Sequence, residues 1–456
     1  MNAKSDSPHG DVMAASARHR RGRGRGRVAV AAALLSFLAA AACGGNAGSG
    51  DDAGASDGAI DLTKRGPIEY WAGKDTSGNM RNLIDQFNRE HPEGQVTFHE
   101  LPDNADQQRQ QMIQNDLIKN PRMGVLSMDV VWTSEFAANG RVVPLPADQF
   151  PTDGFLPATV ESATYFDKLY GYPTSSDGGL LYYRKDLLDK AGLEPPTTWA
   201  EMKSACKKIR AVPANRKLDC YAGQYQKYEG LTVNFAEAVN SAGGSITDDD
   251  GKPVVDSPEA EEGLSFLVDS FEDGTIPRGA ITWQEEQGRQ AFQDGKLIFH
   301  RNWPYVYALA MDEGGSSAVD GKFAVAPLPG LTGPGVSSLG GHNMAIARHA
   351  ENKGTAVDFI KFMASQEVMK SNVLATSAAP TLTSLYTDPD IIEKYPYMPI
   401  LLESIQTAEP RPKVVQYGDV TLAIQDSAYL ALQRQMDPDD ALSKLQTDLE
   451  AIIGGG

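Results

Sequence analysis

The sequence has few cysteines and histidines for its length. Of 456 residues, three are cysteine and seven are histidine. The chain has no CxxC pair and no HExxH motif, and its histidines are scattered rather than set at metal-ligand spacing. This argues against a metal site, and no motif points to another cofactor, so we expect neither.

Positive charge is also scarce, with 42 basic against 60 acidic residues and a formal net charge of −18. Without residues 1–42, the remaining 35 basic and 58 acidic residues give −23. An acidic surface of this kind argues against a nucleic-acid partner. Internal repeats are lacking too, which disfavours a tethered structural or adhesion protein.

The N-terminus has the pattern of an export signal. Six arginines precede residues 28–42, an uncharged run of fifteen that is too short for a good membrane-spanning helix. We therefore predict a signal peptide over residues 1–42, with Arg20-Arg21 leaving the twin-arginine route open. Cys43 then follows three alanines, which suits lipidation after cleavage. The Gly-, Ala-, Ser- and Asp-rich stretch Gly44–Gly58 would tether the folded part to the outer membrane surface.

The two other cysteines, Cys206 and Cys220, lie fourteen positions apart. In an exported chain, two such residues favour a disulfide that closes a small loop. The sequence alone leaves two free thiols as the alternative.

The chain is too long for one ordinary core, so we expect two domains of α/β type. Hydrophobic patterns predict strands that alternate with helices. The clearest strands are predicted at 68–71, 96–100, 125–132, 180–183, 297–299, 322–327 and 344–347, and the clearest helices at 79–91, 107–119, 185–191, 198–209, 289–294, 355–366, 388–394, 398–407 and 417–435.

The stretch Lys296–Tyr307, KLIFHRNWPYVY, is the most informative part of the chain. An apolar strand ends there, Asn302 can cap a new helix, and Pro304 suits the first turn of that helix. Trp303 lies at the junction. Ligands of open α/β sheets bind beyond the carboxyl ends of strands, where an indole can support the apolar face of a sugar ring. The alternative is that Trp303 only fills a gap in the core.

Two aspartates lie near the predicted ends of strands. Asp75 follows the strand 68–71 and precedes the helix 79–91, so ligand contact and helix capping both fit it. Asp129 interrupts the apolar run 125–132, which has the pattern of a strand covered on both faces. An unpaired buried carboxylate is costly, so Asp129 needs a specific donor or an exposed turn. Ligand contact and a structural hydrogen bond both remain open.

Four further residues are candidates, each with a structural alternative. Asp177 lies in a polar bend that would line a hinge or form an ordinary hairpin loop. Glu285 would contact ligand or remain a solvated carboxylate at a helix end. Gly341 would let backbone amides approach a ligand or only form a turn. Arg411, fixed between two prolines, would bind hydroxyls or form a surface salt bridge.

Several segments together resemble one family, and their order and spacing carry the resemblance. They are DVVWTSEFAANG (129–140), KLYGYPTSSDGGLLYYRKDLL (168–188), the PPTTW helix start (195–199), AFQDGKLIFHRNWPYV (291–306) and EPRPKVVQY (409–417). With the lipoprotein-like signal, they resemble extracellular solute-binding proteins of carbohydrate ABC transporters. The similarity is greatest to the actinobacterial trehalose-binding lipoproteins within the maltose/trehalose-type group.

The resemblance implies a two-lobed α/β fold of the periplasmic-binding-protein type II. Each lobe would hold a mixed sheet flanked by helices, with the ligand cleft between the lobes. Residues 43–65 would be the lipidated cysteine and tether. The N-terminal lobe would comprise residues 66–174 and 327–378, and the C-terminal lobe residues 175–326 and 379–456.

The resemblance also assigns roles to residues. Trp303 would stack on a glucose-like ring, Gly341 would make a backbone contact, and the hydroxyls would be bound by Asp75, Asp129, Asp177, Glu285 and Arg411. At Asp177 the sequence departs from the trehalose binders, which have asparagine there. An ionised aspartate accepts hydrogen bonds and cannot donate them, so the departure bears on which disaccharide binds.

We therefore expect the substrate-binding subunit of an ABC importer rather than an enzyme. It would be monomeric, anchored to the outer face of the membrane by lipid alone, and would deliver an α-linked disaccharide to permease subunits. Trehalose is favoured over maltose-like or other α-glucosides. The alternative is a secreted glycoside hydrolase, with Asp129 and Glu285 as paired carboxylates across a glycosidic bond.

Overall fold

The computed structural model describes residues 61–311 and 314–455. The predicted signal peptide, Cys43 and most of the predicted tether lie outside the described residues. Within the described ranges, no helix combines the length and apolar character needed to cross a membrane.

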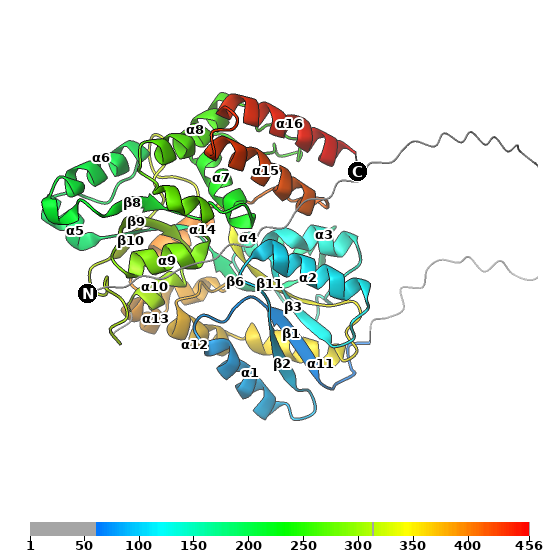
Figure 1. Ribbon diagram of the computed structural model, residues 1–456. Helices are drawn as coiled ribbons and strands as arrows, with labels where there is room; N and C mark the ends of the chain where they lie inside the picture. The colour runs from blue at the N-terminus through cyan, green and yellow to red at the C-terminus, as the bar shows by residue number, and fades with distance from the viewer. Residues whose placement is uncertain (1–60, 312–313, 456) are drawn as a thin grey trace, which may run out of the picture. The chain divides into compact units, whose positions relative to one another are not determined.

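The first of two main sheets has five strands in the order β2-β1-β3-β11-β6. Strand β1 is parallel to β2 and β3, while β11 is antiparallel to β3 and β6, so this sheet is mixed (Figure 1). Its strands are β1 (Ile68–Ala72), β2 (Val96–Glu100), β3 (Met123–Asp129), β6 (Tyr172–Asp177) and β11 (Gly340–Ile346).

The second sheet has four strands in the order β10-β7-β9-β8 and is also mixed, since only β8 and β9 run parallel. Its strands are β7 (Leu180–Tyr183), β8 (Asp219–Ala222), β9 (Leu297–Asn302) and β10 (Ala324–Ala326). A separate two-stranded hairpin is formed by β4 (Thr164–Tyr165) and β5 (Lys168–Leu169).

Each sheet has its own set of helices. We call the first sheet and its helices the first lobe, and these helices are α1 (Asn79–Glu90), α2 (Ala105–Leu117), α3 (Thr133–Ala138), α4 (Pro157–Ser162) and α11 (Lys353–Met363). The second lobe holds the second sheet with α5 (Lys185–Ala191), α6 (Trp199–Arg210), α7 (Glu229–Ser241), α8 (Pro258–Glu272), α9 (Glu285–Gln293), α15 (Tyr417–Leu432) and α16 (Pro438–Gly454).

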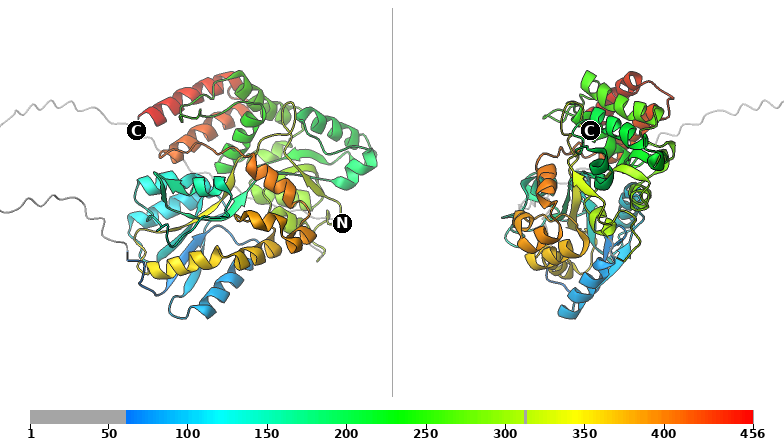
Figure 2. Two further views of the ribbon diagram at one scale, coloured as in Figure 1. Left: turned by 180° about the vertical axis from the view of Figure 1, so that it is seen from behind. Right: turned by 90° about the vertical axis from the view of Figure 1, so that its left-hand side faces the viewer.

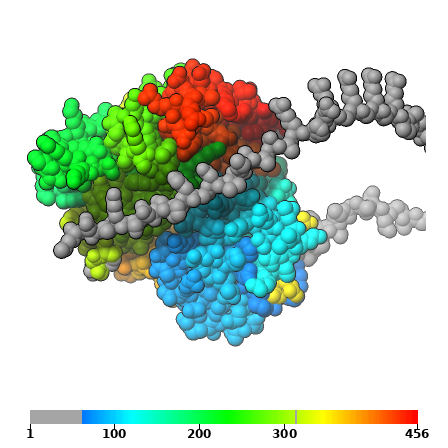
Figure 3. Space-filling model, in the orientation of Figure 1, coloured from blue at the N-terminus to red at the C-terminus, as the bar shows by residue number. Residues whose placement is uncertain are grey.

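The remaining helices are α10 (Val306–Ala310), α12 (Gln366–Thr376), α13 (Pro389–Lys394) and α14 (Met398–Gln406). Short 3-10 turns occur at η1 (Val130–Trp132), η2 (Pro213–Asn215), η3 (Arg278–Thr282) and η4 (Thr383–Thr387). Figure 2 shows α15 and α16 beside α7 and α8, and in Figure 3 the blue and cyan first-lobe segments lie below the green and red second-lobe segments.

Amphipathic patterns explain why these elements bury the faces they do. All five residues of β1 are buried, and α1 buries Leu83, Ile84 and Phe87 on one side. Residues at spacings of three and four share a helix face, so a single apolar stripe covers the sheet while the polar side remains in water. Helix α7 of the second lobe is an exception, because it is buried on all sides along most of its length.

The chain crosses between the lobes at three places. The first crossing is Gly178-Gly179 between β6 and β7, and the second is the segment 327–339 between β10 and β11. The third is the segment 407–416 before α15. The second and third run side by side, since the N–H of Leu339 donates to the carbonyl of Glu409 at 3.0 Å. Adjacent crossings of this kind place residues from both lobes around one region.

Several predicted elements have different boundaries in the structure. The strand predicted over 125–132 ends at Asp129, whose carboxylate accepts from the N–H of Val131 at 3.2 Å and so caps η1. The strand predicted at 297–299 continues to Asn302, and the helix expected around Pro304 begins only at Val306. The side-chain oxygen of Asn302 accepts from the N–H of Trp303 at 2.8 Å, so Asn302 does not cap that helix.

The helix predicted at 289–294 begins earlier, at Glu285. The reason is a reciprocal cap in which Gln287 accepts from the N–H of Gln284 at 3.0 Å. Cys206 on α6 and Cys220 on β8 form a disulfide, with their Cα atoms 5.5 Å apart.

Candidate functional site

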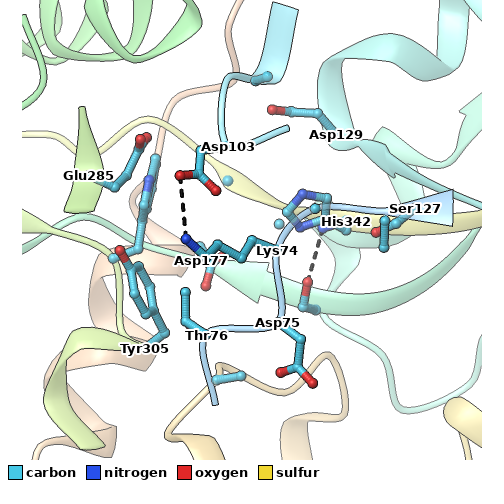
Figure 4. A pocket seen from close by; sticks show the side chains of 18 of the residues that line it. Lys74, Asp75, Thr76, Asp103, Ser127, Asp129, Asp177, Glu285, Tyr305 and His342 are labelled. Carbon is cyan, nitrogen blue, oxygen red and sulfur yellow. Dashed lines mark hydrogen bonds and ion pairs between the residues drawn. The ribbon is translucent and has the colours of Figure 1, made fainter. Parts of the chain in front are cut away.

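A cavity of about 520 Å³ is lined by residues of both lobes and of the crossing segments. Its volume lies in the range typical of small-molecule sites. All seven residues predicted to bind ligand line it: Asp75, Asp129, Asp177, Glu285, Trp303, Gly341 and Arg411. Figure 4 shows Glu285 and Tyr305 on one side of the cavity and Asp129, Ser127 and His342 on the other.

Trp303 is fixed by a cation on one of its faces. The guanidinium carbon of Arg301 lies 3.8 Å from the centroid of the indole, and Glu237 holds that guanidinium through two hydrogen bonds. The Trp303 carbonyl also accepts from the hydroxyl of Tyr182 at 2.8 Å. A ligand can therefore stack only on the face that Arg301 leaves open, and that face is held in place before any ligand arrives.

Two glycines of β11 bring bare backbone to the cavity, and the first of them lies against the indole. A β-carbon on Gly340 would lie 2.9 Å from the indole of Trp303 and 3.1 Å from the β-carbon of Asp177. Gly341 has φ of +117°, and a β-carbon there would lie 2.3 Å from the carbonyl oxygen of Ser175. Only glycine fits these contacts, so strand β11 approaches the cavity floor as bare backbone.

Asp177, at the end of β6, has a carboxylate that makes no hydrogen bond to any other residue the structure describes. Burial, together with the charge of Asp129, raises the pKa of Asp177 to about 7, while Arg301 opposes the shift. A buried carboxyl group of this kind is stabilised when it gains a hydrogen-bond partner. A ligand hydroxyl is well suited because it can donate to the ionised form or accept from the protonated form.

Arg411 joins carboxylates from both lobes. Its guanidinium donates to Glu229 on α7, and to Asp129 at the end of β3 at 3.1 Å. Glu229 is also held by the hydroxyl of Tyr417 at 2.5 Å and that of Thr421 at 2.7 Å. The ion pair of Arg411 with Glu229 is therefore buried and hydrogen-bonded, unlike the surface salt bridge considered from the sequence.

Arg411 retains one unused donor, because its Nε is buried with no acceptor among the described residues. Burial raises the pKa of Glu229, against the opposing effect of Arg411.

Glu285 and Asp75 make local hydrogen bonds and also line the cavity. Glu285 accepts from the hydroxyl of Tyr228 at 2.6 Å, and burial raises its pKa. Asp75 accepts from the hydroxyl of Ser77 at 2.9 Å and from the N–H of Arg81 at 3.4 Å, in the first turn of α1. The two roles considered for Asp75 are thus compatible, since Asp75 lines the cavity and its carboxylate supports the helix start, although Figure 4 shows the carboxylate pointing away from the other labelled side chains.

Several lining residues were missed in the sequence analysis. The main ones are Lys74, Asp103, Tyr228, Glu229, Tyr305 and His342. Lys74 and Asp103 form an ion pair at 3.7 Å (Figure 4), with both side chains about half exposed. Tyr305 stands two residues after Trp303, so proximity could have indicated it, whereas Glu229 had no such signal. Among the described residues, no cluster of three or more His, Cys, Asp or Glu side chains suits a metal ion.

Residues 73–370 match the family described as bacterial extracellular solute-binding protein. A probable ABC transporter-binding protein of Deinococcus radiodurans is 34% identical over 343 residues, covering 73% of this chain and 80% of that protein. The mannitol-binding protein of Pseudomonas aeruginosa is 24% identical over 395 residues, covering 80% of this chain and 88% of that protein.

Among solved structures, maltose-bound MalE3 of T. maritima is 34% identical with a TM-score of 0.80, covering 84% of this chain and 99% of that one. The neighbours confirm the predicted fold class, a two-lobed α/β binding protein of type II with mixed sheets flanked by helices. The chain belongs to the bacterial extracellular solute-binding protein family.

Proposed function

We propose that this chain is the substrate-binding subunit of a sugar ABC importer. Its ligand would be an α-linked disaccharide, with trehalose favoured over maltose-like or other α-glucosides. The observation that carries the proposal is the single cavity that combines a fixed indole with carboxylates from both lobes. The similarity to a maltose-bound protein at 34% identity supports a sugar as ligand.

The proposed contacts follow from the chemistry of the lining. The open face of Trp303 would stack on the apolar face of one ring, which removes that face from water. Asp177 and Glu285 would accept hydrogen bonds from hydroxyls near this ring, and Asp75 from a hydroxyl beside α1. Gly341 would offer backbone contact to the sugar.

At the other end of the cavity, the proposed contacts involve groups already in use. Asp129 would offer its second oxygen to the sugar, since Arg411 and the N–H of Val131 both use the first. Arg411 would contribute through its remaining donor, which has no acceptor among the described residues.

The mechanism would be binding without chemistry. Because ligand groups bind side chains of both lobes, the ligand has more contacts when the lobes are close, and this difference shifts the population towards the closed form. The closed form would present a surface to the permease subunits, and the sugar would be released unchanged. The lobe boundaries 66–174 with 327–378, and 175–326 with 379–456, remain expectations from the sequence, and the crossings described above would move two of them to 178–179 and 407–416.

We also propose that the mature protein begins at Cys43 and is held at the outer face of the membrane by lipid alone, as a monomer. Export of this kind agrees with a family of extracellular proteins. The signal, cleavage and lipid are testable by mass spectrometry of the membrane-extracted protein, and a Cys43→Ala variant should then be released into the medium.

The proposed ligand can be tested by titration calorimetry of the purified protein with trehalose, maltose and sucrose, while free glucose is measured in the same samples. We expect binding heat with trehalose or another α-linked disaccharide and no released glucose. Released glucose would instead support hydrolysis. Absence of heat with every α-linked disaccharide would contradict the proposed ligand class.

A further inference from the structure

Outside the ligand cavity, the two lobes touch through α2 of the first lobe and α15 of the second. The side-chain amide of Gln425 on α15 donates to the carboxylate of Asp106 on α2 at 3.2 Å. Gln425 is buried and Asp106 is half-buried. Neither residue lines the cavity. In Figure 1, α15 lies directly above α2 and α3, which agrees with this contact.

This hydrogen bond is the outer end of a chain that reaches the cavity. The same Gln425 amide donates to the hydroxyl of Thr421 at 3.0 Å, and that hydroxyl donates to Glu229 at 2.7 Å. Glu229 is the partner of Arg411, which also binds Asp129. The chain therefore starts on a first-lobe carboxylate outside the cavity, passes through the second lobe, and returns to a first-lobe carboxylate inside it.

A second contact lies on the same pair of helices. Arg109 on α2 is held by Glu135 through hydrogen bonds of 2.7 and 2.5 Å, and its guanidinium lies against Gly418 at the start of α15. A β-carbon on Gly418 would lie only 2.0 Å from the Arg109 guanidinium. The Arg109 side chain thus reaches across to α15 and fills the space that a side chain at position 418 would need.

We propose that Asp106 is a positioning residue for lobe closure. Its hydrogen bond to Gln425 would hold α2 against α15 and so lengthen the lifetime of the ligand complex, without any contact between Asp106 and the ligand. The bond is present without ligand, and opening of the lobes would break it and leave both groups in water. The lobe contact itself is independent of which ligand binds, whereas its effect on ligand lifetime rests on the function proposed above.

The first test is a double-mutant cycle on the full chain, with trehalose and maltose as probes. Asp106→Ala and Gln425→Ala should each raise the dissociation rate by about tenfold, the value of a net hydrogen bond to a charged group, with little change in the association rate. The dissociation rate of the double variant should be no higher than that of the faster-dissociating single variant, because one bond joins the two residues.

Asp106→Asn serves as the conservative rescue, since its carboxamide oxygen still accepts from Gln425, and it should remain close to the unmodified protein. Asp85→Ala on α1 is the matched control, because Asp85 is exposed and makes no hydrogen bond within the described part of the chain. Equal affinities for Asp106→Ala and the unmodified protein would overturn the proposal. A double variant whose increase in dissociation rate equals the product of the two single increases would also overturn the proposal.

The second test needs no ligand and so separates this proposal from the proposed function. Amide hydrogen exchange of the unliganded protein should quicken in peptides of residues 229–232 and 417–425 in Asp106→Ala, and again in Gly418→Ala. Exchange in β3 should not change, whereas a general loss of stability would quicken exchange there as well. Unchanged exchange at α7 and α15 would refute the lobe contact even if sugar binds. The expected exchange with no sugar binding would leave the contact supported and contradict the proposed ligands.

Discussion

The two ends of the cavity use their carboxylates in opposite ways. At one end, Asp129 and Glu229 share the guanidinium of Arg411, and Glu229 also receives two hydroxyls. At the other end, Asp177 has no hydrogen-bond partner among the described residues, and Glu285 has only Tyr228 besides its own backbone. The carboxylates of the Arg411 end are thus paired internally, although the Nε of Arg411 still has no acceptor among the described residues, while the Trp303 end has acceptors still to be used.

This difference separates structural demand from ligand demand. Buried charges that are paired and hydrogen-bonded are costly to break, so the Arg411 end should matter first for the folded state and the relation of the lobes. Acceptors without partners lose little when they are replaced and gain when a ligand supplies donors. The Trp303 end should therefore dominate ligand affinity, and four substitutions test this division.

The largest effect is expected from Arg411→Met. It leaves Asp129 and Glu229 as unpaired carboxylates in a buried site, which costs about 3–5 kcal/mol of unfolding free energy. Urea unfolding followed by circular dichroism measures this loss. The control is Lys413→Met on the same crossing segment, where the exposed ion pair with Glu161 should contribute less than about 1 kcal/mol. Similar midpoints for the two variants would break the comparison.

Next is Trp303→Ala, which should weaken sugar binding by about 100-fold, or ~3 kcal/mol, because the ring provides the apolar contact area. Calorimetric titration with the best-bound disaccharide measures it. Trp303→Phe retains a flat ring and should recover much of the affinity. The unfolding free energy should fall less than in Arg411→Met. The reverse order of the two stability losses would show that the indole is mainly a core residue.

The third prediction concerns pH and Asp177. Its pKa in the folded protein is about 7, above the ordinary 3.8, so the folded state binds a proton that the unfolded state has lost. Its stabilising contribution is complete below about pH 4 and is lost as pH rises through about 7. Asp177→Asn should therefore flatten the fall in melting temperature between pH 4.5 and 8, measured by scanning calorimetry.

The Asp177→Asn variant should also be more stable than the unmodified protein at pH 8. Asp85→Asn is the control and should leave the profile unchanged. Burial also raises the pKa of Glu229, so part of the slope should remain in Asp177→Asn. Identical profiles for Asp177→Asn and the unmodified protein would mean that another group carries the whole dependence.

The smallest effect is expected from Glu285→Gln. The carboxamide oxygen can still accept from Tyr228, so the packing is retained and only the charge on a ligand hydrogen bond is lost. We expect binding about threefold weaker, in keeping with the difference between charged and neutral hydrogen bonds. Competition calorimetry resolves a change of this size. A loss greater than that of Trp303→Ala would reverse the ranking within the Trp303 end.

The sequence was most informative where a residue type and its local pattern already define an environment. The strand that leads to Trp303, and the alternation of strands with helices, follow from short-range hydrophobic patterns. The resemblance of several segments to one family then indicated residues that the structure brings to one cavity, although they come from six separated parts of the chain. That these residues bind ligand stays a prediction.

The sequence could not indicate contacts between residues that lie far apart along the chain. Glu229 is hydrogen-bonded to Arg411, 182 positions away, and no local pattern announces that pair. The same limit explains why a surface salt bridge was one of the two roles considered for Arg411, since its two prolines describe only its own backbone. Helix starts were misplaced where side chains decide them, as with Gln284 and Gln287 at α9. Such caps depend on orientation as well as residue type.

The glycine beneath the indole limits how this receptor can diversify. Any side chain at position 340 would collide with Trp303, so the aromatic floor cannot be reshaped from below without being given up. New selectivities must come from exchanges around the rim, where acceptors can be traded one at a time. For anyone converting the protein into a sugar biosensor, the floor is the part to keep and the rim is the part to mutate.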